Sequence, residues 1–322
     1  MGNCMFDIVT CGELLAEFVA ESTGQPFDRT GTYQGPFPSG APAIFASQAA
    51  LMGAKVAYAG RVGRDGFGDI IVNRLRTNGI DIEAVERDEE YPTGTAFVSY
   101  QADGDRNFVF NITHSAAGRF ELDFLQAERL SDCRYFHVMG SSLTSDKAIE
   151  IMLGMAKRVK EKGGKISFDP NIRSELMALD ATREAILTLV NLCDIFLPSE
   201  ADIAWLAQGT AETERDTIAR LMQHNAMELL VMKRAAKGCQ AYSGETDLLV
   251  MSREVAEVDP TGAGDCFGGA LIAALACGET LEDALTLANA AGAHAVTHLG
   301  PMEGCAPREI LEAMIETNKG AL

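Results

Sequence analysis

The second half of the chain alternates short apolar runs with longer segments whose apolar residues recur at helical spacing. Short apolar runs are typical of buried strands, and the longer periodic segments are typical of the helices that cover them. The predicted strands are 134–138, 165–168, 194–197 and 229–232. The predicted helices are 145–162, 181–192, 200–207 and 213–224. This order predicts right-handed βαβ crossovers, and hence an α/β fold with a mostly parallel sheet flanked by helices.

Polar residues follow these predicted strands directly. The segments Asp169-Pro170-Asn171, Pro198-Ser199-Glu200 and Lys233-Arg234 each stand where a strand ends. Ligands of open parallel sheets bind outside the carboxyl ends of the strands. We therefore expect these segments and residues 259–265 to line one crevice.

The segment Asp259-Pro260-Thr261-Gly262-Ala263-Gly264-Asp265 is the most informative one. Residues 255–258 predict a short strand and the run 266–275 a buried helix, so the glycines fall at a strand-to-helix turn. Free N–H groups and the helix dipole bind anions there, and glycine permits a positive φ and close approach of a phosphate oxygen. A carboxylate beside a bound phosphate is repelled by it. Asp265 therefore indicates a base that accepts a proton from a hydroxyl attacking the phosphate, which predicts a kinase.

Two other interpretations fit the same segment. An acid in the first turn of a helix stabilises that helix, and Gly-x-Gly turns are common connectors. A dinucleotide fingerprint would use Gly262, Gly264 and Gly268. It fits poorly, because Asp265 would face the pyrophosphate and the acids at 282–283 lie in a helical stretch instead of at a strand end.

The first half of the chain has a different pattern. Residues 94–112 alternate in polarity around the turn Asp103-Gly104-Asp105, which predicts an antiparallel hairpin. The segment 14–38 is also non-helical and is rich in glycine, proline and threonine. We expect a small antiparallel sheet from about 14–38 and 93–113, within a single domain over 1–322. Because phosphoryl transfer must exclude water, this sheet would be a lid over the crevice; the alternatives are surface decoration or a dimer contact.

The composition is that of an ordinary globular enzyme. The 322 residues, of which 47% are hydrophobic, suffice for a large core. The net charge of −19 disfavours nucleic acid and anionic membranes as partners. No apolar run approaches the roughly 18 residues of a membrane span and no signal-peptide pattern is present, so we expect a cytoplasmic protein. The eight scattered cysteines lack a C-x-x-C pair and indicate reduced thiols.

Two longer motifs resemble known signatures. Residues 259–270 match the C-terminal signature of the PfkB family of carbohydrate kinases. The segment 39–68 is similar to the N-terminal signature, except that Ser39 stands where glycine is usual and Ile44 where a sugar-contacting asparagine is usual. Essentially the whole chain resembles this family. The resemblance implies a ribokinase-like fold and an ATP-dependent sugar kinase; the other classes to be weighed are an NAD(P)-linked oxidoreductase and a non-catalytic sugar sensor on a kinase fold.

The resemblance also implies roles for individual residues. Asp265 would be the catalytic base, and the backbone of Gly262, Ala263 and Gly264 the anion hole for the migrating phosphoryl group. The residues implied to hold the sugar are Gly12, Glu17, Ser39, Gly40, Phe97, Phe110, Ile112, Asn171 and Arg173. For Glu17, a solvated acid at a strand end is an equal alternative. The residues implied to bind ATP are Lys233, Ala235, Gly238, Thr261, Asn289 and Gly292.

The same resemblance implies metal ions. The segment Ser199-Glu200-Ala201-Asp202 stands where the family has its magnesium-associated Asn-x-x-Glu motif, so Asp202 would contact a hydrated Mg²⁺ ion. A monovalent cation is a further cofactor that the resemblance suggests. Asn289 and Gly292 fall in a helix predicted over 285–297, beside the adenine.

The expected substrate is a neutral sugar. Members that phosphorylate 2-keto-3-deoxygluconate place an arginine shortly before a Ser-Ala pair, and here Ile112 stands at that position before Ser115-Ala116. An isoleucine cannot offset the cost of burying a carboxylate. The elements Gly94-Thr95-Ala96-Phe97 and Asp169-Pro170-Asn171 favour a ketohexose such as fructose or tagatose. The 2-keto-3-deoxygluconate and ribose alternatives remain open.

Overall fold

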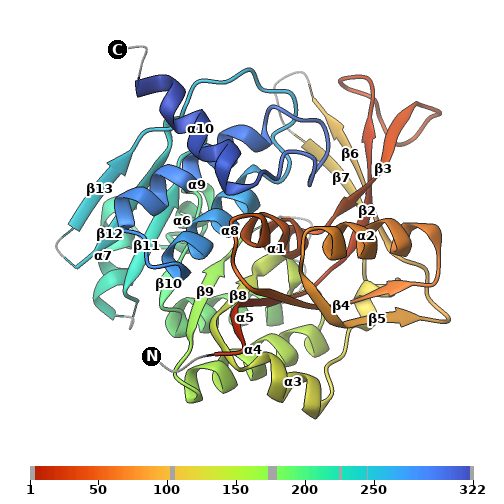
Figure 1. Cartoon of the computed structure of the whole chain (residues 1–322), viewed down its shortest axis with the longest axis horizontal. Coiled ribbons are helices and arrows are strands. Elements are labelled where there is room, and N and C mark those ends of the chain that lie inside the picture. The colour runs from red at the N-terminus through yellow and green to blue at the C-terminus, as the bar shows by residue number, and fades with distance from the viewer. Residues whose placement is uncertain (1–3, 102–105, 173–179, 225–226, 245, 320–322) are drawn as a thin grey trace.

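A large sheet of nine strands carries most of the core in the described part of the chain (Figure 1). The structure is a computed structural model that describes residues 4–101, 106–172, 180–224, 227–244 and 246–319. In spatial order the strands are β13 (Thr246–Val250), β12 (Cys239–Ser243), β11 (Leu229–Lys233), β10 (Ile195–Phe196), β9 (Lys165–Asp169), β8 (Cys133–Met139), β1 (Phe6–Cys11), β4 (Val56–Gly63) and β5 (Asp81–Asp88). The pairs β11–β12 and β12–β13 are antiparallel, and the other pairs are parallel.

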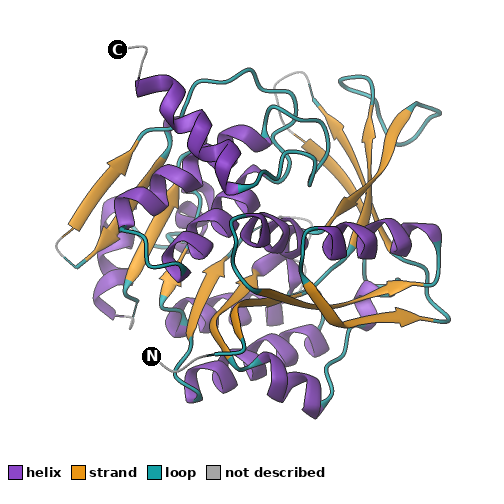
Figure 2. Ribbon diagram, viewed as in Figure 1, coloured by secondary structure: helices purple, strands orange, loops and turns teal. Residues whose placement is uncertain are grey.

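Helices cover both faces of this sheet (Figure 2). Those packed on one face are α1 (Ala41–Leu51), α2 (Gly66–Thr77), α8 (Ala263–Ala276) and α9 (Leu281–Ala295), with α10 (Arg308–Lys319) beside them. Those on the other face are α3 (Phe124–Leu130), α4 (Asp146–Glu161), α5 (Asp180–Leu192), α6 (Glu200–Leu206) and α7 (Glu214–His224). Short 3₁₀ turns lie at Ala117–Arg119, Gly140–Ser142 and Ala235–Lys237. No helix of the described residues is long and apolar enough to cross a membrane.

Each strand and helix predicted for the second half up to β11 is confirmed to within one residue at either end. The strand predicted at 255–258 is wrong. The amide groups of Val258 and Asp259 donate to the carbonyl oxygen of Val296 at the end of α9, so this segment packs against a helix end instead of joining the sheet. The helix predicted over 285–297 begins earlier, at Leu281, because the Thr280 side chain caps it.

The small sheet lies beside the large one at the upper right of Figure 1. Its order is β3 (Tyr33–Ser39), β2 (Leu15–Ala20), β6 (Gly94–Tyr100) and β7 (Arg106–Asn111). The outer pairs β2–β3 and β6–β7 are antiparallel, as expected, and the central pair β2–β6 is parallel. The turn predicted between β6 and β7 lies outside the described residues.

The helix α8 runs through the core because its residues are small. A Cβ atom at Gly269 would lie 2.4 Å from the Phe45 carbonyl oxygen of α1, so glycine permits the two helices to approach closely. Nearly every residue of α8 from Asp265 to Ala276 is buried. This packing fixes the N-terminus of α8 at the edge of the large sheet where the parallel strands end.

Candidate active site

The N-terminus of α8 presents backbone N–H groups at this edge. Gly262 is the N-cap residue and has a φ of 81°, a left-handed conformation that favours glycine. A Cβ atom there would lie 2.4 Å from the Pro301 carbonyl oxygen. Gly264 lies within the first turn of the helix, so the tolerance of glycine for positive φ is used only at Gly262. Free N–H groups in a helix's first turn are suited to bind an anion.

Asp265 stands in the same turn and is 7% exposed. It borders a cavity of about 940 Å³ together with Lys233 and Asp169. Other predicted site residues that line this cavity are Asn171, Asp202, Ala235, Gly238, Gly262, Ala263, Gly264, Asn289 and Gly292. The prediction that the ends of β9, β10 and β11 and the turn at 259–265 line one crevice is therefore confirmed, except that Asp259 and Thr261 do not border the cavity.

Lys233 is a largely buried cation in the wall of this cavity. It ends β11, and its Nζ atom forms an ion pair with Asp169 Oδ2 at the end of the neighbouring strand β9. Burial lowers the pKa of Lys233, but the carboxylates of Asp169, Asp202 and Asp265 outweigh burial and hold the pKa above its ordinary value. A Cβ atom at Gly264 would lie 3.6 Å from Lys233 Nζ, so this charge stands beside the N-terminus of α8.

Asp202 lines the cavity but is tied into the backbone. It is 3% exposed, and its Oδ2 atom accepts from the Ser199 N–H group over 2.7 Å in a capping box that starts α6. Its Oδ1 atom accepts from the Ile172 N–H group over 3.0 Å. Among the described residues no group of three or more His, Cys, Asp or Glu side chains could hold a metal ion. These hydrogen bonds fix the loop between β10 and α6 and hold it against the end of β9.

The far end of the cavity is formed by turns near β12 and α9. Gly238 has a φ of 92°, and a Cβ atom there would lie 2.1 Å from the Val250 carbonyl oxygen. Ala235 also has a positive φ, of 48°. Asn289 Nδ2 donates to the Val250 carbonyl oxygen over 2.9 Å, so this amide anchors the end of β13 to α9. Thr261 does not line the cavity; it is buried, 8% exposed, in the turn before Gly262.

The predicted sugar residues near β1 and β2 form a second group. Glu17 on β2 is 4% exposed, and Ser39 Oγ donates to its Oε2 atom over 2.7 Å. The alternative of a solvated acid at this position is therefore wrong. Gly40 caps α1 and has a φ of 115°. Glycine is favoured at this position because a Cβ atom would lie 2.3 Å from the Glu13 carbonyl oxygen. Gly12 has a φ of 150° and approaches Ser142 closely.

This second group lies next to the turn at α8. A Cβ atom at Gly262 would be 3.3 Å from Ile44 Cγ2, so the first turns of α1 and α8 are neighbours. Sequence reasoning missed Glu13, a buried carboxylate that accepts hydrogen bonds from the hydroxyl groups of Ser141, over 2.8 Å, and Ser142. Its position directly after Gly12 is the signal that could have identified it.

The predicted sugar residue Phe97 lies on the face of the small sheet that points away from Asp265. The ring of Phe97 stacks on that of Phe18, with centroids 5.0 Å apart. Side chains alternate along a strand, so Phe97 points to the face opposite Tyr100, whose hydroxyl group contacts Asp259 beside the turn at α8. Phe97 is therefore not brought together with Asp265. Arg173 lies outside the described residues.

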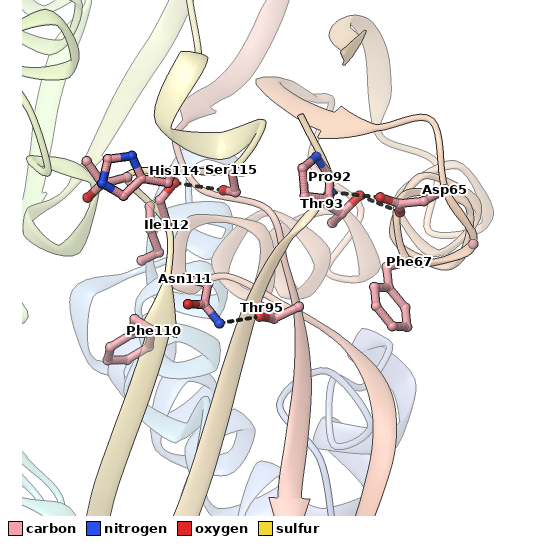
Figure 3. Close-up of a pocket in the computed structure, with 12 residues that line it drawn as sticks. Asp65, Phe67, Pro92, Thr93, Thr95, Phe110, Asn111, Ile112, His114 and Ser115 are labelled. Atoms are coloured by element: carbon pink, nitrogen blue, oxygen red, sulfur yellow. Dashed lines mark hydrogen bonds between the residues drawn. The ribbon is translucent and has the colours of Figure 1, made fainter. Parts of the chain in front are cut away.

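Phe110 and Ile112 line a different cavity, of about 860 Å³, at the end of the small sheet (Figure 3). The two cavities share no lining residue. Polar side chains that line this second cavity form hydrogen bonds with one another. Asn111 Nδ2 donates to Thr95 Oγ1 over 3.0 Å, and Thr93 Oγ1 donates to Asp65 Oδ1 over 2.7 Å (Figure 3). Ile112 itself is 6% exposed and packs with Leu15 and Ala96.

Several known proteins are similar to this chain in sequence and in fold. The model of the pfkB family of carbohydrate kinases matches residues 5–309. Fructokinase-2 of Zea mays is 33% identical over 304 residues, which cover 91% of this chain and 89% of that protein. The crystal structure of an E. coli protein assigned as ribokinase II, in its apo form, is 42% identical with a TM-score of 0.91, and the match covers 97% of this chain and 100% of that chain. The same protein in complex with ATP and Mg²⁺ is 41% identical with a TM-score of 0.88, over 97% of this chain and 100% of that chain.

A fructokinase from Vibrio cholerae O395, in a form bound to fructose, ADP and calcium ion, is 26% identical with a TM-score of 0.80, and the match covers 96% of this chain and 98% of that chain. An α/β fold with a glycine-capped helix start and a buried carboxylate beside it, together with these similarities, places the chain among sugar kinases of the ribokinase-like fold. The chain belongs to the pfkB family of carbohydrate kinases. The predictions of this fold and of a sugar kinase are confirmed, and the oxidoreductase and sensor alternatives are set aside.

Proposed function

We propose that this sugar kinase transfers the γ-phosphoryl group of ATP to a hydroxyl group of fructose. The observation that carries the proposal is the position of Asp265 in the first turn of α8, in one cavity with Lys233 and the turn at Gly262. The fructokinase of Zea mays and the V. cholerae fructokinase bound to fructose support the choice of sugar. The similar E. coli protein in complex with ATP and Mg²⁺ supports the choice of nucleotide.

Asp265 accepts the proton of the attacking hydroxyl group in the proposed reaction. The N–H groups of Gly262, Ala263 and Gly264 stabilise the charge that develops on the oxygens of the migrating phosphoryl group. Lys233 adds a fixed positive charge beside them, and its ion pair with Asp169 holds it in place. In a protein with a net charge of −19, these local donors offset the repulsion between the phosphates and the whole molecule.

The nucleotide base occupies the far end of the cavity in this proposal. Ala235, Gly238, Asn289 and Gly292 form its walls, and Thr261 supports the turn beneath the phosphates. A hydrated Mg²⁺ ion, which would neutralise phosphate charge, fits against Asp202 through its water molecules, since that carboxylate borders the cavity. The monovalent cation stays a prediction, and turnover in potassium against sodium buffers tests it.

The sugar binds in the proposal between the first turn of α1 and the small sheet. Glu17, Ser39 and Gly40 supply polar groups near the turn at Gly262, and Asn171 lines the cavity on the side of the large sheet. Ile112 lies in the wall of the separate cavity at the end of the small sheet; as a sugar contact its apolar, uncharged side chain would favour a neutral ketohexose over a sugar acid. Arg173 remains a predicted sugar contact, whereas Phe97 faces away from the crevice and Phe110 borders the separate cavity at the end of the small sheet.

The small sheet acts as the lid of a single domain in this proposal, because β6 ends beside the turn that leads into α8. A homodimer through its outer face also remains a prediction. That face carries the Phe18–Phe97 stack, and Val109 on β7 is 40% exposed. Sedimentation of the purified protein tests the dimer, and a Val109→Lys variant that sediments like the wild type contradicts this contact.

An assay that couples ADP release to a colour change tests the reaction itself. The sugars are D-fructose, D-tagatose, D-ribose and 2-keto-3-deoxygluconate, at fixed ATP and magnesium. The expected result is the highest kcat/KM for fructose. A higher value for ribose or for the sugar acid contradicts the substrate part of the proposal, and ADP release without any sugar contradicts a dedicated sugar kinase.

A further inference from the structure

Tyr100 connects the small sheet to the turn that leads into α8. It is the last residue of β6, and its hydroxyl group donates to Asp259 Oδ1. The same hydroxyl group lies 2.7 Å from Thr261 Oγ1. Asp259 and Thr261 lie three residues and one residue before Gly262, the N-cap residue of α8. One hydroxyl group from the small sheet thus contacts both side chains that shape this turn.

Asp259 is the residue around which the turn is organised. It is 0% exposed, and its Oδ1 atom also accepts from the Thr261 N–H group over 2.9 Å. Its Oδ2 atom accepts from the Gly300 N–H group over 2.9 Å. A buried carboxylate is costly unless donors compensate its charge, so each of these three donors helps to fix its orientation. Of these three donors, Tyr100 is the one that belongs to the small sheet.

The end of β6 is held so that Tyr100 reaches this position. The Gly24 N–H group donates to the Tyr100 carbonyl oxygen over 2.7 Å, and Ser99 Oγ donates to the Gln25 carbonyl oxygen over 2.5 Å. Arg106, the partner of Tyr100 across the hairpin, lines the cavity that contains Asp265. The end of the hairpin is therefore at the site of phosphoryl transfer. Burial raises the pKa of Tyr100 and the charge of Asp259 raises it further, so the hydroxyl group remains a donor.

We propose that Tyr100 is a positioning residue for phosphoryl transfer. By holding Asp259 and Thr261, its hydroxyl group keeps the N–H groups of Gly262 to Gly264 aimed at the migrating phosphoryl group while the small sheet covers the crevice. The inference rests on the proposed function, because it takes this turn to be the anion hole. It makes the position of the small sheet a condition for fast transfer, and it leaves the binding of ATP to the far end of the cavity unaffected.

Tyr100→Phe tests this role, because it removes only the hydroxyl group. Tyr33→Phe is the matched control, since Tyr33 packs its ring against Phe97 on the opposite face, with centroids 5.7 Å apart. A hydrogen bond to a charged group supports an expected loss of roughly tenfold to a hundredfold in kcat with fructose for Tyr100→Phe. The Kd of Tyr100→Phe for an ATP analogue, measured by calorimetry, stays within about twofold of wild type. The kcat and the Kd of Tyr33→Phe both stay within the same range.

Hydrogen exchange supplies a second readout that does not depend on turnover. The amide groups of residues 261–264 exchange faster in Tyr100→Phe than in wild type, while those of α4 are unchanged. Wild-type kcat in Tyr100→Phe overturns the proposal. A loss of ATP affinity and thermal stability in proportion to kcat also overturns it, because the hydroxyl group would then be a structural support only.

A failure of the proposed function is distinguishable from these outcomes. If the wild type phosphorylates none of the sugars, the substrate assignment fails, and the exchange of residues 261–264 still decides whether Tyr100 holds the turn. Faster exchange then supports the positioning role, and unchanged exchange contradicts it.

Discussion

The two sides of the crevice are built by different means. On the proposed phosphate side, one contiguous segment forms the proposed anion site, because the left-handed backbone of Gly262 turns the chain directly into α8 and places Asp265 in its first turn. On the sugar side, the buried carboxylates of Glu13 and Glu17 bond with serines that are distant in sequence, Ser39 and Ser141 among them. Local backbone geometry therefore shapes the first side, whereas contacts between distant segments shape the second.

Asp265→Asn has the largest expected effect on this comparison. If Asp265 is the base, kcat falls by roughly 10² to 10⁴-fold while the protein folds and binds ATP. Asp283→Asn is the control, because Asp283 also lies in the first turn of a helix, α9, yet borders neither of the two cavities. Equal activity of the two variants would mean that Asp265 serves its helix only.

Lys233→Met probes the fixed charge of the phosphate side. The loss of one preorganised cation lowers kcat by roughly 10² to 10³-fold. It also leaves the buried Asp169 unpaired, so the free energy of unfolding falls by about 3 to 5 kcal/mol. The double variant Lys233→Met/Asp169→Asn should regain stability without regaining kcat, and an active double variant would contradict a catalytic role for this charge.

The pH dependence of the free energy of unfolding shows whether the charge of Lys233 stabilises the folded protein. Its pKa in the folded protein is raised above the ordinary 10.5, so its stabilisation is fully present below pH 10.5 and is lost as the pH rises above that value. Chemical unfolding of wild type and of the double variant Lys233→Met/Asp169→Asn, from pH 8 to 11, checks this. A wild type that loses no more stability than the double variant contradicts it.

Ile112→Arg tests the sugar side with a smaller expected effect. A charge-assisted hydrogen bond to a carboxylate should shift the ratio of kcat/KM for 2-keto-3-deoxygluconate over fructose by roughly tenfold to a hundredfold. Ile112 packs with Leu15, so some of the variant will unfold, but the ratio of two substrates does not depend on the folded fraction. Ile112→Leu is the control, and an unchanged ratio in Ile112→Arg means that Ile112 does not contact the sugar.

Closure of the small sheet over the crevice should give the smallest of these effects, a change in hydrogen exchange. Fructose should protect the amide groups of β6 and β7 from hydrogen exchange, whereas ATP alone should protect residues 235–238 and the part of α9 near Asn289. Equal protection of β6 and β7 with and without fructose would contradict a lid.

The sequence alone predicted the strands β8, β9, β10 and β11 of the large sheet and the helices between them, because their short apolar runs alternate regularly with segments of helical periodicity. It placed Asp265 and Gly262 correctly at the start of a buried helix, since a glycine-rich turn acts through its own backbone. It failed at 255–258, where a short and mostly apolar run is typical of a strand but the amide groups of Val258 and Asp259 bond the end of α9. It also grouped Phe97 with the sugar residues, because the pattern of one strand does not tell which face meets the crevice.

The amino-acid sequence by itself thus determined the class of protein, the parallel sheet and the glycine-rich turn that begins α8, all of which depend on residues that are close along the chain. Only the tertiary structure decided that Glu17 is buried against Ser39, that Lys233 pairs with Asp169 and that Tyr100 meets Asp259. The physical reason is that a buried charge must find its donors wherever the packing of distant segments brings them. No local pattern specifies those partners.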